Sequence, residues 1–365
     1  MENKRIIITR KIQLLIDSKD PEFIKQARNQ LYQWQRICFK AANMIMSHQF
    51  VQEQVKDFFY LTEDVKLKLA DKKRDEDGML QLSREGTTYH VLSNHFKGQV
   101  PMNMMAALNH SLLSYFNKEK VAYWKGEKSL RNYKSNIPMP FSGRSIYKYT
   151  LAADGRNYCF NLYRIPFRTY LGRDRSDKKA ILERLRTGAL KLLASSLQIV
   201  KGKIFLLASI EVEKEQHVLD PAVIAEASLS IAHPVVVRVG NNEYTIGNEE
   251  EFLHRRLAIQ AAIHRVQKGA VFNRGGHGRK RKMKSLEDYK HLEKRYVEQK
   301  LHVYSRMLID FCVKHRAATL LLLNQQAKEE IAKDDPFLLK NWSYYSLKEK
   351  ISYKAEKAGI QVIVE

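Results

Sequence analysis

The chain has few cysteines and no long apolar run. Its 365 residues include three cysteines, Cys38, Cys159 and Cys312, and no C-x-x-C pair. This spacing excludes a four-cysteine zinc site, and isolated cysteines are usually small buried hydrophobes. No apolar run approaches the roughly 20 residues of a membrane-spanning helix. The N-terminal segment MENKRIIITRK lacks the apolar core and cleavage site of a signal peptide. We therefore expect a cytoplasmic protein without zinc.

Acidic residues are also scarce relative to basic ones. Lys and Arg number 63 against 40 Asp and Glu, which gives a net charge of +23 and a pI of about 9.7. A charge of this size indicates a polyanionic partner, with nucleic acid favoured over an anionic membrane. The hydrophobic content of 44% is typical of a globular protein, and the length suits two or three domains.

The first 220 residues read as a β segment, a helical segment and a second β segment. β-rich runs occupy residues 5–17, 145–150, 157–171 and 190–214, with a hairpin turn at Val200-Lys201-Gly202-Lys203. Helical patterns occupy residues 21–49, 51–69 and 101–120, and a charged loop lies at 71–78. One assembly joins the first strand to the later strands in a barrel, with the helices inserted between them.

Strands and helices alternate after a predicted boundary at Asp220-Pro221. We expect strands at 227–239, 244–246, 318–323 and 360–364, with a turn at Gly240-Asn241-Asn242. Helices are expected at 249–267, 285–315 and 343–358, and a glycine-rich basic loop precedes the second of them. This order suits an α/β domain of the RNase H-like kind. In the last helix Leu347, Ile351, Ala355 and Ala358 share one apolar face.

The strongest chemical signal is a basic segment that follows Phe252. Its glycines let the backbone approach a phosphate chain, and its arginines can grip phosphate in a bidentate manner. A solvated surface is the alternative interpretation of such a run, but the overall charge of +23 favours a polyanion. The candidate nucleic-acid-binding residues are Arg255, Arg256, Arg265, Arg274, Arg279, Lys280, Arg281, Lys282 and Lys284.

A second basic and aromatic stretch covers residues 123–134. Its candidates are Arg131, Tyr133 and Lys134, because aromatic rings stack on unpaired bases while cations pair with phosphate. Packing at a domain surface explains these residues equally well.

Three segments carry a resemblance to a known family. Residues 227–256 (ASLSIAHPVVVRVGNNEYTIGNEEEFLHRR), 318–326 (ATLLLLNQQ) and 340–364 resemble the RuvC-like half of the transposon-encoded TnpB proteins and the miniature type V-F CRISPR effectors. The string GRKRKMKSLEDYKH at 278–291 resembles the family region that helps to hold the guide RNA and the heteroduplex.

The resemblance implies an α+β multidomain fold. Residues 1–20 and 135–218 would form a β-barrel wedge domain, residues 21–134 an inserted helical recognition lobe, and residues 219–365 a degenerate RuvC-like α/β domain without the zinc ribbon.

The family's catalytic acids are absent from the positions that match. The family motif V-D-L-G-x-x-x-P, aligned at Pro234, puts Ser228 at the Asp and Ser230 at the Gly. The second family acid, a Glu that ends an apolar strand, corresponds to Asn324, and the third would follow the last residue, Glu365. Two magnesium ions require hard carboxylate ligands. Glu226 would lie roughly 7 Å from the ideal position along its strand. We therefore predict no catalytic magnesium site and a protein that is not an enzyme.

The resemblance further implies a guide RNA, target double-stranded DNA and a short motif beside the target. In the family's helical lobe, Asn103, Asn109 and Ser111 are candidates for reading that motif, with capping or surface roles as the alternative. The expected output is control of transcription in the bacterial nucleoid, by recruitment of RNA polymerase through a sigma factor. Promoter occupancy, an active RNA-guided endonuclease and an RNA chaperone are the rivals, and a homodimer is left open.

Overall fold

The computed structural model describes residues 5–58, 83–173, 176–230, 233–272, 275–323 and 344–365. The chain forms two compact units, one of residues 7–212 and the other of residues 1–6 with 213–365. Both units contain helices and a β-sheet, which confirms the predicted mixed α+β class. None of the helices in the described ranges combines the length and the apolar character that crossing a bilayer requires.

A seven-stranded antiparallel sheet organises the unit of residues 7–212. Its strands are β1 (Arg5–Ile16), β2 (Met139–Phe141), β3 (Ile146–Leu151), β4 (Tyr158–Leu162), β5 (Ile165–Tyr170), β6 (Ser195–Val200) and β7 (Lys203–Glu213), in the order β2-β6-β7-β1-β5-β4-β3. The central place of β1 confirms that the first strand joins the later ones. Since no pairing between described residues links the edge strands β2 and β3, the closed barrel stays a prediction.

Two tight turns set the register of this sheet. Lys201 and Gly202, with φ of 49° and 76°, join β6 to β7 at the predicted position. Tyr163 and Arg164 join β4 to β5 with φ of 52° and 66°, which divides the single β run that the sequence predicts at 157–171. Two successive residues with positive φ match the twist of a β-hairpin.

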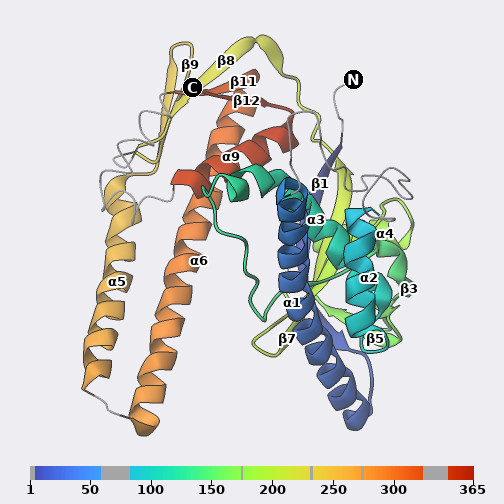
Figure 1. Cartoon of the computed structure of the whole chain (residues 1–365). Coiled ribbons are helices and arrows are strands. Elements are labelled where there is room, and N and C mark those ends of the chain that lie inside the picture. The colour runs from blue at the N-terminus through green and yellow to red at the C-terminus, as the bar shows by residue number, and fades with distance from the viewer. Residues whose placement is uncertain (1–4, 59–82, 174–175, 231–232, 273–274, 324–343) are drawn as a thin grey trace. The chain divides into compact units, whose positions relative to one another are not determined.

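In the described residues of this unit, three helices separate β1 from β2, and a fourth follows β5. They are α1 (Pro21–Phe58), α2 (Arg84–Phe96), α3 (Met102–Trp124) and α4 (Lys178–Arg186). α1 and α3, both labelled in Figure 1, pack against each other. Leu31 and Ile45 on α1 and Met104 on α3 are buried. The sequence analysis missed α2 and α4. A signal for α2 was available, because Ser83 caps it by accepting a hydrogen bond from the Gly86 N–H at 3.2 Å.

The second unit contains a mixed five-stranded sheet. Its strands are β8 (Asp220–Ser228), β9 (Val235–Val239), β10 (Asn242–Ile246), β11 (Ala317–Leu322) and β12 (Gln361–Val364), in the order β10-β9-β8-β11-β12. β8, β9 and β10 are antiparallel, whereas β11 is parallel to both β8 and β12. Asp220 and Pro221 lie at the start of β8, and the predicted strand at 227–239 is two strands.

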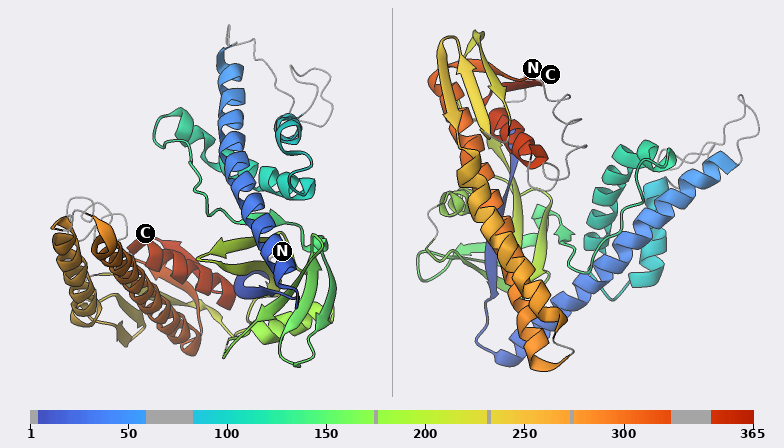
Figure 2. Two further views of the ribbon diagram at one scale, coloured as in Figure 1. Left: turned by 90° about the horizontal axis from the view of Figure 1, so that it is seen from below. Right: turned by 90° about the vertical axis from the view of Figure 1, so that its left-hand side faces the viewer.

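The helices of this unit are α5 (Glu249–Val271), α6 (Gly276–Lys314) and α9 (Tyr344–Ala358). Figures 1 and 2 show α5 and α6 side by side as two long helices, with α9 against α6. The predicted apolar face of α9 is confirmed, because Leu347, Ile351, Ala355 and Ala358 are all buried in the core beside β11.

The predicted basic loop is instead the beginning of a helix. Residues 276–284 form the first turns of α6, which therefore starts nine residues before the predicted position Ser285. Arg, Lys and Met are strong helix formers, while each glycine in a helix interior costs only about 1 kcal/mol. The three glycines at 275, 276 and 278 lie at the helix start, where that cost is smallest.

Lys354 on α9 is a charged group at the packed contact with α6. Its Nζ donates hydrogen bonds to Ser305 Oγ at 2.8 Å and to the His302 carbonyl oxygen. Desolvation lowers its pKa from 10.5 to about 8, with repulsion from Arg306 and Lys350 adding to the effect. The folded state thus disfavours the charged form of this side chain.

We predict that Lys354 makes the stability rise with pH. Between pH 8 and 10.5 the unfolded chain binds the Lys354 proton more tightly, so deprotonation favours folding in this window. Urea unfolding of the native chain and Lys354→Met at pH 7 and pH 9.5 should show the native chain gaining on the variant as pH rises. The gain should be on the order of 1 kcal/mol, because partial exposure screens the charge. A difference independent of pH would contradict this account.

Candidate nucleic-acid interface

The α5–α6 helix pair carries the basic segment. Asn248 caps α5 by accepting a hydrogen bond from the Glu251 N–H at 2.7 Å, and three glutamates occupy the first turn. Acidic groups at a helix N-terminus complement its dipole. From Phe252 to Leu286 the sequence then contains ten Lys or Arg residues and no Asp or Glu. Positive charge is therefore concentrated after the first turn of α5 and in the first turns of α6.

Arg256 is a structural residue, which corrects its predicted place in the interface. It is 9% exposed, and its Nε donates to Glu293 Oε1 on α6 at 3.0 Å. Gln260 Nε2 donates to the same oxygen at 2.8 Å. The spacing in the sequence indicates that Arg256 is buried, because it lies four residues after Phe252 and three before Ile259 and so shares their helix face. The structure shows all three residues buried.

The neighbouring Arg255 is exposed and differs in its contacts. Its guanidinium lies 5.3 Å from the centre of the Tyr296 ring, a cation–π contact. The Tyr296 hydroxyl donates to the Glu251 carbonyl oxygen at 2.7 Å, which anchors the ring. Arg255 is thus held at the surface with its charge available to a ligand.

The other described cations of the segment divide between surface and structure. Exposed positions are Arg265 and Lys268 on α5 and Lys280, Arg281 and Lys284 on α6. Lys282 is half-buried, and its Nζ donates to the Gly269 carbonyl oxygen at 2.8 Å, which ties α6 to the last turn of α5. Arg279 lies within α6, and Arg274 lies outside the described residues.

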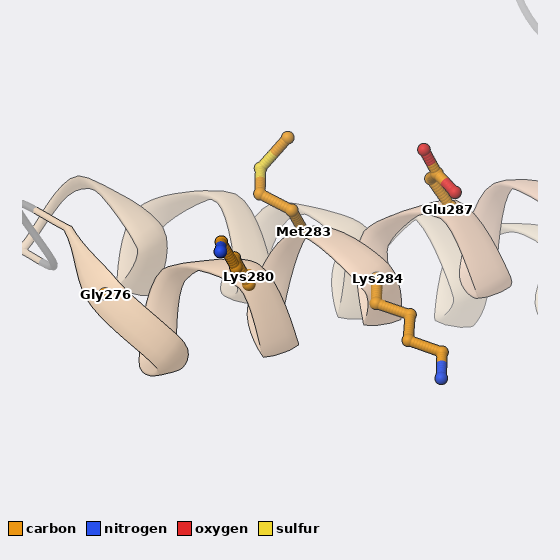
Figure 3. A pocket seen from close by; sticks show the side chains of 5 residues that line it. All are labelled: Gly276, Lys280, Met283, Lys284 and Glu287. Carbon is orange, nitrogen blue, oxygen red and sulfur yellow. The ribbon is translucent and has the colours of Figure 1, made fainter.

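A shallow surface pocket marks the cationic face of α6. Figure 3 shows the five residues that line it, Gly276, Lys280, Met283, Lys284 and Glu287. Gly276, Lys280 and Lys284 follow one another at intervals of four, so they share a helix face. In Figure 3 the Met283 and Glu287 side chains point to one side of the helix and Lys284 to the other, so the lining combines two ammonium groups with a thioether and a carboxylate.

The second basic stretch is largely engaged within the protein. Arg131 binds Glu119 through two hydrogen bonds of 2.6 Å, and the Tyr123 hydroxyl donates to the same carboxylate at 2.5 Å. The bond from Arg131, followed by that from Tyr123, lowers the pKa of Glu119 to about 2. The Tyr133 backbone is fastened to the Asn43 side chain at 2.8 and 3.2 Å. Lys134 is exposed.

The three predicted motif-reading residues on α3 are not equivalent. Asn109 is 1% exposed and its Nδ2 donates to the Glu85 carbonyl oxygen at 2.9 Å, so packing against α2 explains it and it cannot reach a base edge. Ser111 Oγ donates to the Ala107 carbonyl oxygen at 2.8 Å within its own helix. Asn103 is exposed near the start of α3.

The predicted site of lost acids lies where two parallel strands end together. Leu322 of β11 pairs with Ala227 of β8, and the Leu323 N–H donates to the Ala227 carbonyl oxygen at 2.9 Å. The half-buried Ser228 is the next residue of β8. Asn324 lies outside the described residues.

The described side chains at this edge do not fit a pair of magnesium ions. Glu226 is exposed, two residues before Ser228, and faces Arg238 across the β8–β9 ladder. One hydroxyl and one carboxylate beside a guanidinium supply too little negative charge. Within the described ranges, no group of three or more His, Cys, Asp or Glu side chains is arranged to hold a metal ion. That the chain uses neither zinc nor magnesium stays a prediction.

Comparisons with known proteins identify relatives. No family model matches the chain. It is 27% identical over 256 residues to the CRISPR-associated endodeoxyribonuclease Cas12f1 of Sulfoacidibacillus thermotolerans, covering 66% of this chain and 60% of that protein. It is 24% identical over 373 aligned positions to the protein of the same name from Syntrophomonas palmitatica, covering 97% and 72%.

A solved structure extends the likeness to the fold. The cryo-EM structure of the Cas12f1–sgRNA–target DNA complex matches with a TM-score of 0.68 and 15% identity, covering 99% of this chain and 89% of that one. The chain is therefore homologous by sequence and fold to Cas12f1, a type V-F CRISPR effector, which confirms the resemblance.

The names of the relatives correct one prediction. The missing acids led us to predict that the chain is not an enzyme, whereas both relatives are endodeoxyribonucleases, so the homology points to a nuclease family. The prediction failed because single residues at aligned positions describe one site and do not decide the lineage of the chain.

We predict that Arg256→Met destabilises the fold and leaves electrostatic RNA binding in place. Removing the guanidinium leaves the Glu293 carboxylate without this cationic partner, which should lower the free energy of unfolding by about 1–3 kcal/mol. Arg255→Met is the matched control, and its loss should stay below about 1 kcal/mol because the residue is exposed. Urea unfolding measures both. Equal stability of the two variants would contradict the structural role of Arg256 and would make it a candidate nucleic-acid-binding residue again.

Proposed function

We propose that this chain binds a guide RNA and, through it, opens matched double-stranded DNA beside a short flanking motif. The observation that carries the proposal is the α5–α6 pair, whose residues 252–286 include no acidic residue and six cations described as exposed, namely Arg255, Arg265, Lys268, Lys280, Arg281 and Lys284. Such a surface is electrostatically unfavourable unless a polyanion neutralises it.

The relatives support this choice of polyanion. The matching solved structure is a complex of Cas12f1 with sgRNA and target DNA. In RNA-guided recognition, base pairing by the guide supplies sequence specificity, while the protein contacts the backbone and a short motif. A cationic helix pair suits contacts with a phosphate backbone.

The proposed division of labour follows the order of the elements. Residues 1–20 and 135–218 would act as the wedge domain, residues 21–134 as the recognition lobe with Asn103 near the flanking motif, and residues 219–365 as the RuvC-like domain. The chain spans 60% of the length of one curated relative, so these assignments are extended from longer proteins. We place the protein at the bacterial nucleoid, where both nucleic acids occur.

Binding to DNA can control transcription whether or not the DNA is cut. A protein that opens a promoter can recruit RNA polymerase through a sigma factor, which is the output we propose, or can repress by occupying the promoter. Cleavage is the second candidate function, and the names of the relatives favour it.

We predict that the exposed cations of α6 set the salt dependence of guide binding. Lys280→Ala, Arg281→Ala and Lys284→Ala, combined in one variant, remove three phosphate contacts. The slope of log K against log salt concentration for the copurified RNA should fall by about 2–3, at roughly 0.7–0.9 per contact. Lys294→Ala is the control, because that exposed lysine of α6 is already paired with Glu298. Unchanged affinity and slope in the triple variant would make this run a solvated surface.

We predict guide-dependent opening of DNA by the loaded complex. Matched duplex should show permanganate-reactive thymines on the displaced strand, and mismatches next to the flanking motif should abolish them, because pairing starts there. Magnesium is then added to the same samples. A guide-dependent product that disappears in Glu226→Gln would establish the cleavage candidate.

A pull-down from the native cell distinguishes the two transcriptional outputs. Recovery of RNA polymerase or a sigma factor supports recruitment, whereas its absence with reduced transcription supports occupancy. Opening that is independent of the guide would end the RNA-guided proposal.

A further inference from the structure

The tip of the α5–α6 pair displays an apolar dipeptide that the sequence analysis did not single out. Val271, the last residue of α5, is 79% exposed, and Phe272, which follows it, is 86% exposed. Phe272 is the most exposed large hydrophobic residue of the described part of the chain. Two adjacent exposed apolar residues, one of them aromatic, make this tip a candidate contact site for a ligand.

The dipeptide is presented from an ordered helix end. Phe272 keeps helical backbone angles, with φ of −76° and ψ of −10°. The hydrogen bond from Lys282 Nζ to the Gly269 carbonyl oxygen fixes the last turn of α5 to α6. A Cβ on Gly269 would lie 3.2 Å from that Nζ, so glycine leaves room for this crossing. The Phe272 backbone is thereby held in place relative to α6.

The surroundings of the tip are cationic and sterically open. Arg265 and Lys268 on α5 and Lys280 and Arg281 on α6 are exposed on the turns next to it. A Cβ added at Gly275, Gly276 or Gly278 would meet nothing within 4 Å, so the backbone there faces open space. A phosphate chain can approach such a surface closely.

An unpaired nucleobase satisfies both features at once. Its π face stacks on an aromatic ring while its flanking phosphates pair with lysine and arginine. A bilayer anchor needs an apolar helix face, whereas here two side chains project among cations. An apolar protein surface would gain nothing from these cations.

We infer that Phe272 stacks on an unpaired base of the bound nucleic acid, with Val271 widening the apolar contact. The inference rests on the proposed function, since it assigns one subsite of the same surface. It also distinguishes this tip from the remaining cationic surface, which contacts phosphates in any strand.

The test uses the full chain and two probes that carry 2-aminopurine at an unpaired position. One is an RNA stem with a single-stranded loop, and the other is single-stranded DNA; an RNA duplex without unpaired bases is the reference. Phe272→Ala should weaken binding of a stacked probe by about 5- to 100-fold and relieve the quenching of 2-aminopurine. Phe272→Trp should preserve both, and duplex affinity and salt slope should not change. The probe that responds identifies the strand.

Controls separate failure of this inference from failure of the proposed function. Val218→Ala changes a residue that is 81% exposed in the same unit but outside the helix pair, and it should bind like the native chain. If the native chain binds no RNA, the proposed function fails. If it binds RNA and Phe272→Ala leaves affinity and quenching unchanged for both probes, the stacking subsite is refuted. Equal weakening of all probes, or binding to phosphatidylserine vesicles that depends on Phe272, also refutes it.

Discussion

The ion pair between Arg256 and Glu293 is the interaction on which the cationic surface depends. Nine of the ten Lys and Arg residues between Phe252 and Leu286 lie on α5 and α6, and this stretch contains no Asp or Glu, so these parts of the two helices repel each other. The 3.0 Å contact from Arg256 to Glu293, reinforced by Gln260, places one carboxylate from outside that stretch between them. Lys282 adds a second link by donating to the Gly269 carbonyl oxygen near the tip. With the pair held in this way, Arg255, Arg265, Lys268, Lys280, Arg281 and Lys284 are exposed to solvent.

Side chains of one chemical type therefore serve different purposes according to their place in the fold. Arg256 is buried and bonded, Arg255 rests on an aromatic ring, and Arg131 is engaged by Glu119 on α3. Arg265, Lys280 and Arg281 remain exposed. These three exposed cations can offer their charge to a ligand, as Arg255 can, and all of them lie on the α5–α6 pair.

The sheet of the second unit presents a different relation between fold and chemistry. The carboxyl ends of β8 and β11 meet, as the parallel register of Ala227 and Leu322 shows, and polar side chains at such an edge converge. Here the described residues at the meeting point are Ser228 and, two positions earlier, Glu226 opposite Arg238. The relatives named above are endodeoxyribonucleases, whereas this edge of the chain supplies few acidic ligands among its described residues.

The sequence alone was sufficient to predict the mixed fold class, the turn at Lys201-Gly202 and the apolar face of α9. Each depends on composition, on local backbone preference or on periodicity, all of which can be read along a single segment. Only the tertiary structure decided that Arg256 is buried while Arg255 is exposed, that Asn109 is hidden beside α2, and that Phe272 projects from the tip. The burial of each of these residues depends on which face of its helix packs against a neighbouring element. Glu293, the hydrogen-bond partner of Arg256, lies 37 residues away in the chain. A side chain is buried when two segments pack against each other, so the sequence of one segment alone does not specify which of its residues are buried.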